Sequence, residues 1–168
     1  VAPSTWSDLS GVALTLYNGG TGQAYGGPLP LSSFTRRDTV SGFAFYTLDI
    51  SLQNGAPDGL ALALTGEVLQ FLSYEGVFTA TDGVAAGLAS TDIGVWEPAT
   101  TPVGSTLQLT GTGDSYCDFH WQLLSAGTYG TVNGGQSLVP EPATAALWLL
   151  ALAAFPLTWC VRRRGRVA

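Results

Sequence analysis

The sequence predicts an all-β protein, an antiparallel β-sandwich, followed by a single C-terminal transmembrane helix. First, the 168 residues include 22 Gly and 9 Pro and only 11% are charged, a composition that favours short strands joined by turns. Second, several short apolar or alternating runs are separated by turn sequences at close spacing. Third, the last thirty residues differ from the rest, because an uncharged run over 143–161 precedes a cluster of arginines.

The first half of the chain contains two clear strand patterns. Residues 11–17 (GVALTLY) place Val12, Leu14 and Leu16 on one face, and the turn Asn18-Gly19-Gly20 follows. A short edge strand is expected near 23–25. Residues 43–52 predict a longer strand, which ends at turn sequences that begin with Asn54-Gly55.

The second half predicts a hairpin and two further strands. Runs over 59–64 and 67–74 flank Thr65-Gly66, which indicates a β-hairpin whose turn type the sequence leaves open. Residues 79–104 predict an ordered loop with short pieces of structure. Strands are expected over 105–111, with Leu107 and Leu109 on one face, and over 118–121.

Composition divides the chain into three parts. Residues 1–124 form the expected β-domain, the small polar residues 125–138 predict a flexible linker, and 139–168 form the C-terminal segment. Residues 1–138 carry two arginines against eleven acidic residues, a net charge of −9. This acidic domain lacks the basic surface that nucleic-acid binding needs, so no nucleic-acid partner is expected.

The apolar run over 143–161 has the length of a membrane span. As a helix it would be about 28 Å long, close to the hydrocarbon thickness of a bilayer. The basic residues that follow predict a stop-transfer signal with the C-terminus in the cytoplasm and the β-domain exported: Arg162, Arg163, Arg164 and Arg166. A buried core helix and a GPI signal are the alternatives, and the long charge-free run and terminal arginines fit both poorly.

Directly before this run stands Val139-Pro140-Glu141-Pro142. Each proline fixes its own φ and disfavours helix in the preceding residue, so the carboxylate of Glu141 lies on a stiff, extended segment. Motif, apolar helix and terminal arginines together resemble the PEP-CTERM sorting signal. The resemblance implies an exosortase of Gram-negative bacteria as partner. It also implies transient residence in the inner membrane and then release or transfer to the cell surface, with exopolysaccharide or extracellular matrix as further partners.

A second resemblance covers most of residues 8–135. The stretches that carry it are DLSGVALTLYNG (8–19), LQNGAPDGLALAL (52–64), EVLQFLSYEGVFTATDGVAAGLASTDIG (67–94), TPVGSTLQLTGTG (101–113) and Tyr116–Trp121. They are similar to bacterial lamin-tail domains, which implies an Ig-like β-sandwich on a secreted protein, often attached to a nuclease. The opening strands of that family do not appear before Val1, so an N-terminally truncated domain is expected.

Catalytic and metal-binding patterns are sparse. His120 stands between aromatic residues, no nucleophile motif accompanies it, and we predict no enzyme. The calcium candidates are Asp58, Asp82 and Asp92, with Asp114 and Asp118 in further predicted loops, although turn-forming roles fit these residues better. We therefore expect no cofactor. Cys117 and Cys160 predict no disulfide, and Cys117 is expected to be a free, half-buried thiol.

Aromatic residues raise one more interpretation. Trp6, Trp96 and Trp121 are candidates for a carbohydrate-stacking surface, with core packing as the expected alternative. Glu75, between Tyr74 and Phe78, is either part of a turn or a buried, hydrogen-bonded acid.

The sequence leaves three functional hypotheses. The first is an exported, surface-sorted, non-enzymatic protein that an exosortase processes and whose β-domain binds a partner or has a structural role. The second is an accessory or remnant domain of a secreted nuclease. The third is a single-pass membrane-anchored protein that is never cleaved.

Overall fold

The computed structural model describes residues 1–3, 8–53 and 55–139, and this part of the chain is all-β. Eleven strands form three sheets, and the helical content of the described part is limited to two short 3-10 turns, η1 (Leu31–Ser33) and η2 (Tyr116–Asp118). The all-β prediction is confirmed, although the strands divide into three sheets where a sandwich has two. Within the described ranges no helix is long and apolar enough to span a membrane. The predicted helix over 143–161 lies outside them.

The largest sheet has five strands and contains the predicted hairpin. Its order is β3 (Gln23–Pro30), β2 (Val12–Asn18), β6 (Asp58–Leu64), β7 (Glu67–Tyr74) and β8 (Thr91–Asp92). All pairs are antiparallel except β7 and β8. The turn between β6 and β7 has φ 48° at Thr65 and φ 85° at Gly66. Two positive φ values are typical of a type I′ turn, the type that matches strand twist.

One face of this sheet carries the aromatic core. Ala61 of β6 is paired with Phe71 of β7, and Tyr17 of β2 lies on the same face, opposite Gly59. These three side chains pack with Phe78, Ala80 and Ala85. Ala80 and Ala85 belong to the segment predicted as an ordered loop, residues 79–104, and Phe78 directly precedes it. This segment is hydrogen-bonded along its length, for example from the Ser90 amide to the Phe78 carbonyl at 2.9 Å. The loop therefore covers one face of the five-stranded sheet.

The sequence reading missed one hairpin. β4 (Thr35–Val40) pairs with β5 (Phe43–Thr47), and β1 (Ala2–Pro3) pairs with the other edge of β5. β4 escaped prediction because its residues, TRRDTV, are mostly exposed and show no apolar alternation. Its turn, Ser41-Gly42, has positive φ at both residues. β5 ends five residues before the predicted end at 52.

The third sheet has the order β10 (Phe119–Leu124), β9 (Thr106–Gly113) and β11 (Gln136–Leu138). β11 runs parallel to β9 inside the segment predicted as a linker. A second surprise is that the polar face of β9 is the more buried one, because Gln108 is 5% and Thr110 6% exposed. The Gln108 amide donates to the Ala126 carbonyl at 2.7 Å and accepts from Thr128 at 2.8 Å. Polar side chains thus hold residues 125–135 on β9, and the folded part continues to Val139 instead of ending at 124.

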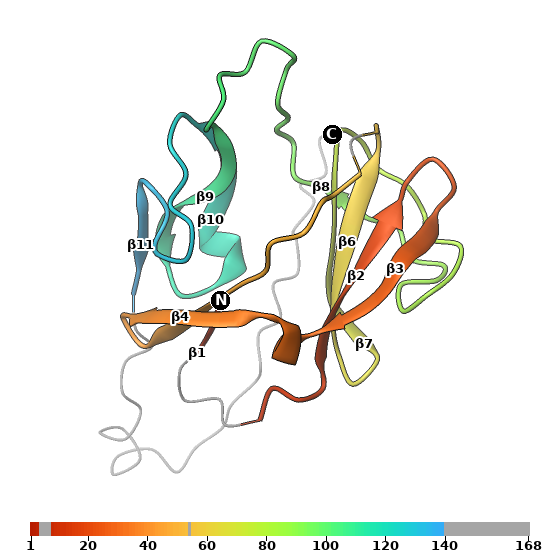
Figure 1. The fold of residues 1–168 in the computed structure, drawn as a ribbon, viewed down its shortest axis with the longest axis horizontal. Helices are drawn as coiled ribbons and strands as arrows, with labels where there is room; N and C mark the ends of the chain where they lie inside the picture. Colours follow the sequence, from red (N-terminus) through yellow and green to blue (C-terminus); the bar gives the residue numbers. More distant parts are fainter. Residues whose placement is uncertain (4–7, 54, 140–168) are drawn as a thin grey trace, which may run out of the picture.

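Figure 1 shows how the three sheets are arranged. The β9 sheet and the five-stranded sheet stand apart, and the β4–β5 hairpin runs across one end between them. Phe45 of β5 lines a cavity with Leu109 of β9, whereas Tyr46 lines a different cavity with Leu14 and Leu62. Neighbouring residues of β5 therefore line cavities shared with the two other sheets. The segment that joins β5 to β6 crosses from one side of the molecule to the other.

Candidate functional site

The predicted sorting motif begins where the described structure ends. Val139 is 44% exposed, and its amide donates to the Gly113 carbonyl of β9 at 2.9 Å. Pro140, Glu141 and Pro142 lie outside the described residues, as do the four C-terminal arginines. The motif thus follows the last described hydrogen bond of the domain with no intervening linker sequence.

Asp58 has the turn-forming role that the sequence favoured, and it also bonds a distant segment. It is the first residue of β6 and only 2% exposed. Its Oδ1 accepts a hydrogen bond from the Gly19 amide and its Oδ2 one from the Gly55 amide, both at 3.0 Å. The carboxylate therefore joins the β2–β3 turn to the start of β6, and both of its oxygens are engaged.

The other two calcium candidates also cap backbone amides. Asp82 accepts from the Ala24 amide of edge strand β3 at 2.7 Å, and Asp92 accepts from the Gly94 amide at 3.0 Å. In the part of the chain that the structure describes, no group of three or more His, Cys, Asp or Glu side chains is placed to hold a metal ion. The structure does not bring the candidates together.

His120 lies on β10 with two polar neighbours. Its Nε2 is 3.0 Å from Thr110 Oγ1 and 3.1 Å from Gln122 Nε2. The amide nitrogen of Gln122 can only donate, so His120 Nε2 accepts in this arrangement. Thr110 has no acidic or basic partner besides this histidine among the described contacts. The pair is a hydrogen-bonded contact between buried Thr110 of β9 and exposed His120 of β10.

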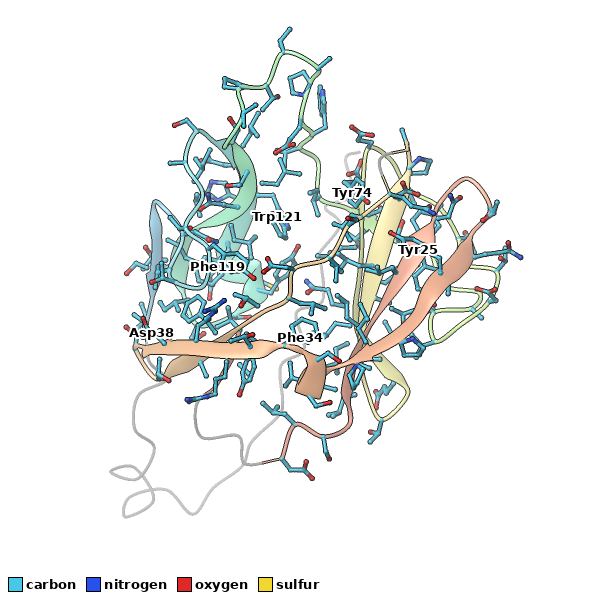
Figure 2. All side chains as sticks on the ribbon, in the orientation of Figure 1. Tyr25, Phe34, Asp38, Tyr74, Phe119 and Trp121 are labelled. Carbon is cyan, nitrogen blue, oxygen red and sulfur yellow. The ribbon has the colours of Figure 1, made fainter. Side chains whose placement is uncertain are left out.

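The candidate tryptophans have different environments. Trp96 is 60% exposed, so core packing is the wrong interpretation for it. Trp121 is half-buried on β10, and its indole nitrogen donates to the Tyr116 hydroxyl at 3.0 Å; Figure 2 shows it on the side of β10 toward the five-stranded sheet. Trp6 lies outside the described residues. A surface formed by all three tryptophans therefore stays a prediction.

Trp96 lines an open cavity of about 330 Å³ together with residues from three other parts of the chain: Leu52, Gln53, Tyr74, Glu75, Glu97 and Leu107. Leu52 and Gln53 come from the crossing segment, Tyr74 and Glu75 from the end of β7, and Leu107 from β9. We call this cavity the Trp96 cleft. It combines apolar side chains with two carboxylates, which no sequence motif had grouped.

Gln53 fixes one wall of the Trp96 cleft. Its backbone carbonyl accepts from the Tyr74 hydroxyl at 2.8 Å, and its backbone amide donates to the Tyr25 hydroxyl at 3.1 Å. Its side-chain Oε1 accepts from the Asn18 side-chain amide at 2.7 Å. Figure 2 shows Tyr25 and Tyr74 at this end of the five-stranded sheet. Burial, and then the negative charges of Asp58 and Glu75 with Tyr25 nearby, raise the pKa of Tyr74 to about 12. This wall is held by hydrogen bonds, and the carboxylates near it are negatively charged.

Glu75 is the strained residue of the cleft. It is exposed, so the alternative of a buried acid is wrong, and its φ is 62°. A left-handed backbone is unfavourable for a residue with a Cβ. Within the described residues the carboxylates of Glu75 and Glu97 have no hydrogen-bond or ion-pair partner.

Cys117 differs from its prediction. It is a free and exposed thiol in η2, a turn that has no buried residue. The neighbouring Asp118 holds this turn by accepting from the Ser115 amide at 2.9 Å.

The chain matches no protein-family model, no curated protein and no solved structure.

Proposed function

We propose that the chain is an exported, surface-sorted, non-enzymatic protein and the substrate of an exosortase. The observation that carries the proposal is the order of three features at the C-terminus: Val139-Pro140-Glu141-Pro142, an uncharged run over 143–161, and four arginines. The run is long enough to span a bilayer, and the arginines favour a cytoplasmic end. The enzyme is inferred from the resemblance to PEP-CTERM signals.

The position of the motif supports this proposal. The uncharged run starts at 143, four residues after Val139, the last described residue of the domain. Even fully extended, four residues reach about 14 Å. The domain would therefore be held close to the membrane surface, and the stiff Pro-Glu-Pro segment would be presented there to a membrane-embedded enzyme.

The proposal includes the role of the β-domain. We infer a lamin-tail-like, Ig-like domain that binds a partner or has a structural role in the cell surface or extracellular matrix, with exopolysaccharide as one partner. The accessory domain of a secreted nuclease and the uncleaved single-pass anchor are the alternatives. The described residues favour neither, since both depend on the upstream reading frame or on processing.

The test is replacement of Glu141 and Pro142 by Ala in a Gram-negative host that has an exosortase. Ser137→Ala, an exposed change just upstream, is the matched control. We expect the control to be processed and exported like the parent chain, and the double variant to stay at full length in the inner membrane. Unchanged processing and location of the double variant would rule out recognition of the motif.

A further inference from the structure

We propose that the Trp96 cleft binds an uncharged hexopyranose unit of a carbohydrate chain, which stacks on Trp96 and donates hydroxyl hydrogen bonds to Glu75 and Glu97. The inference names a site and a ligand class for the binding role proposed above. It rests on the proposed function only for the location, the cell surface or matrix, in which the domain would encounter the carbohydrate. Its evidence is the lining of the cleft, its exposure and its charge.

The lining matches the two sides of a pyranose. A pyranose has an apolar C–H face and a rim of hydroxyl groups. Trp96, Leu52 and Leu107 supply apolar surface, and an exposed tryptophan provides a large, rigid contact area. Glu75 and Glu97 line the same cavity and supply acceptors only. The cleft therefore fits a ligand that has an apolar face and several hydroxyl donors.

The charge of the cleft selects against acidic sugars. The two arginines of the described part lie on β4 and are engaged elsewhere, Arg36 with Thr39 and Arg37 with Thr47 and the ring of Tyr129. No basic side chain lines the Trp96 cleft, and Glu75 contributes to a raised pKa of Tyr74. A uronic acid would meet like charge there, so a neutral unit is favoured.

The conformation of Glu75 adds an independent observation. Glycine or asparagine would adopt φ 62° at lower cost, yet the chain has a glutamate whose carboxylate has no partner among the described residues. Strain of this kind accumulates at binding sites, where a side chain is needed in a fixed place. Gln53, which accepts from the hydroxyl of Tyr74, the residue before Glu75, is held by three hydrogen bonds, so this part of the cleft is formed before a ligand arrives.

The experiment titrates the purified full chain with neutral hexasaccharides of glucose, mannose or galactose, with a uronic acid hexasaccharide and with hexalysine. The detergent is of the polyoxyethylene type, because the sugar headgroup of a glycoside detergent would compete with the ligand for the cleft. Calorimetry gives affinity, and the Trp96 indole N–H signal, assigned by its loss in Trp96→Phe, gives location. We expect at least one neutral hexasaccharide to bind and shift this signal, and the uronate to bind at least tenfold more weakly.

Variants separate the site from general effects. Trp96→Ala should weaken sugar binding about tenfold or more, whereas Val103→Ala, a fully exposed change in the same loop, should leave it unchanged. Glu97→Gln should reduce the discrimination against the uronate. Thermal midpoints show that each variant is folded. The inference is overturned if no neutral sugar binds at millimolar concentration, if Trp96→Ala binds like the parent, or if hexalysine binds more tightly than every sugar.

The outcome is separable from that of the sorting proposal. The variant with Ala at 141 and 142 should bind the same sugars with the same affinity, because the described residues that line the cleft all fall between 52 and 107 in the sequence. If the parent chain is processed normally but binds no neutral sugar, only the proposal for the cleft is rejected. If the parent chain binds a neutral sugar but is not processed by the exosortase, only the sorting proposal is rejected.

Discussion

At the scale of single residues, the acidic side chains divide into those that hold backbone and those that are free. Asp58, Asp82 and Asp92 each accept from backbone amides, whereas Glu75 and Glu97 line the Trp96 cleft without a described partner. The sequence suggested that aspartates in turns bond local backbone, and this is what Asp92 does. It could not show that Asp58 is buried, because that depends on the contact between residues 19 and 58, which are far apart in the chain.

Asp58→Ala is expected to lower the free energy of unfolding by about 2–4 kcal/mol, because it leaves the Gly19 and Gly55 amides without acceptors beside a buried site. Asp92→Ala, which removes one exposed turn contact, should cost less than about 1 kcal/mol. Urea denaturation of the two variants measures the difference. Equal costs would contradict the assigned role of Asp58.

Glu75→Gly should raise the free energy of unfolding by about 0.5–1 kcal/mol. It removes a left-handed strain of about 1–2 kcal/mol and adds a glycine entropy cost of about 0.5–1 kcal/mol. The same variant should weaken sugar binding, since it removes one carboxylate from the cleft. A destabilised variant would show that Glu75 has a structural contact instead.

The pKa of Tyr74 predicts a dependence of stability on alkaline pH. Because burial raises this pKa from its ordinary value of 10.0 to about 12, the folded state favours the neutral phenol. The stabilisation is complete below pH 10 and is lost as the pH rises from 10 toward 12. Tyr74→Phe lacks this group, so its stability should fall less steeply over that range. Parallel curves for the two proteins would refute the prediction.

At the scale of elements, strands with apolar alternation were predictable and polar ones were not. The β6–β7 hairpin followed from two runs around Thr65-Gly66, and β2 and β9 from their alternating leucines. β4 and β11 have no such pattern, because they pair along sheet edges with mostly polar side chains. The Trp96 cleft was beyond prediction for a related reason, since its walls come from four separate segments.

The hairpin turn offers a direct test at this scale. Thr65→Asn should raise the free energy of unfolding by a few tenths to about 1 kcal/mol, because Asn-Gly fits the positive φ values of a type I′ turn better than a β-branched residue does. Thr65→Val, which keeps the branching, is the matched control and should not stabilise. Chemical denaturation compares them, and an Asn variant less stable than the parent would contradict the turn assignment.

At the scale of the whole molecule, an acidic, three-sheet β-domain is followed by a C-terminal segment that resembles a sorting signal. The domain is folded up to Val139, so the proposed processing site adjoins it closely. The proposed helix and its orientation rest on length and charge, and the proposed processing enzyme rests on resemblance. The Trp96 cleft is the proposed binding surface for a partner outside the cell.

The intact mass of the exported protein, purified from an exosortase-bearing host, tests the central claim most directly. The account predicts a form shorter than the 17.4 kDa chain, ending near Pro140-Glu141-Pro142 and lacking the apolar run and the arginines. It also predicts the full-length mass in the same host without its exosortase. A surface or membrane protein that keeps its arginines in both hosts would contradict the account and identify the chain as an uncleaved anchor.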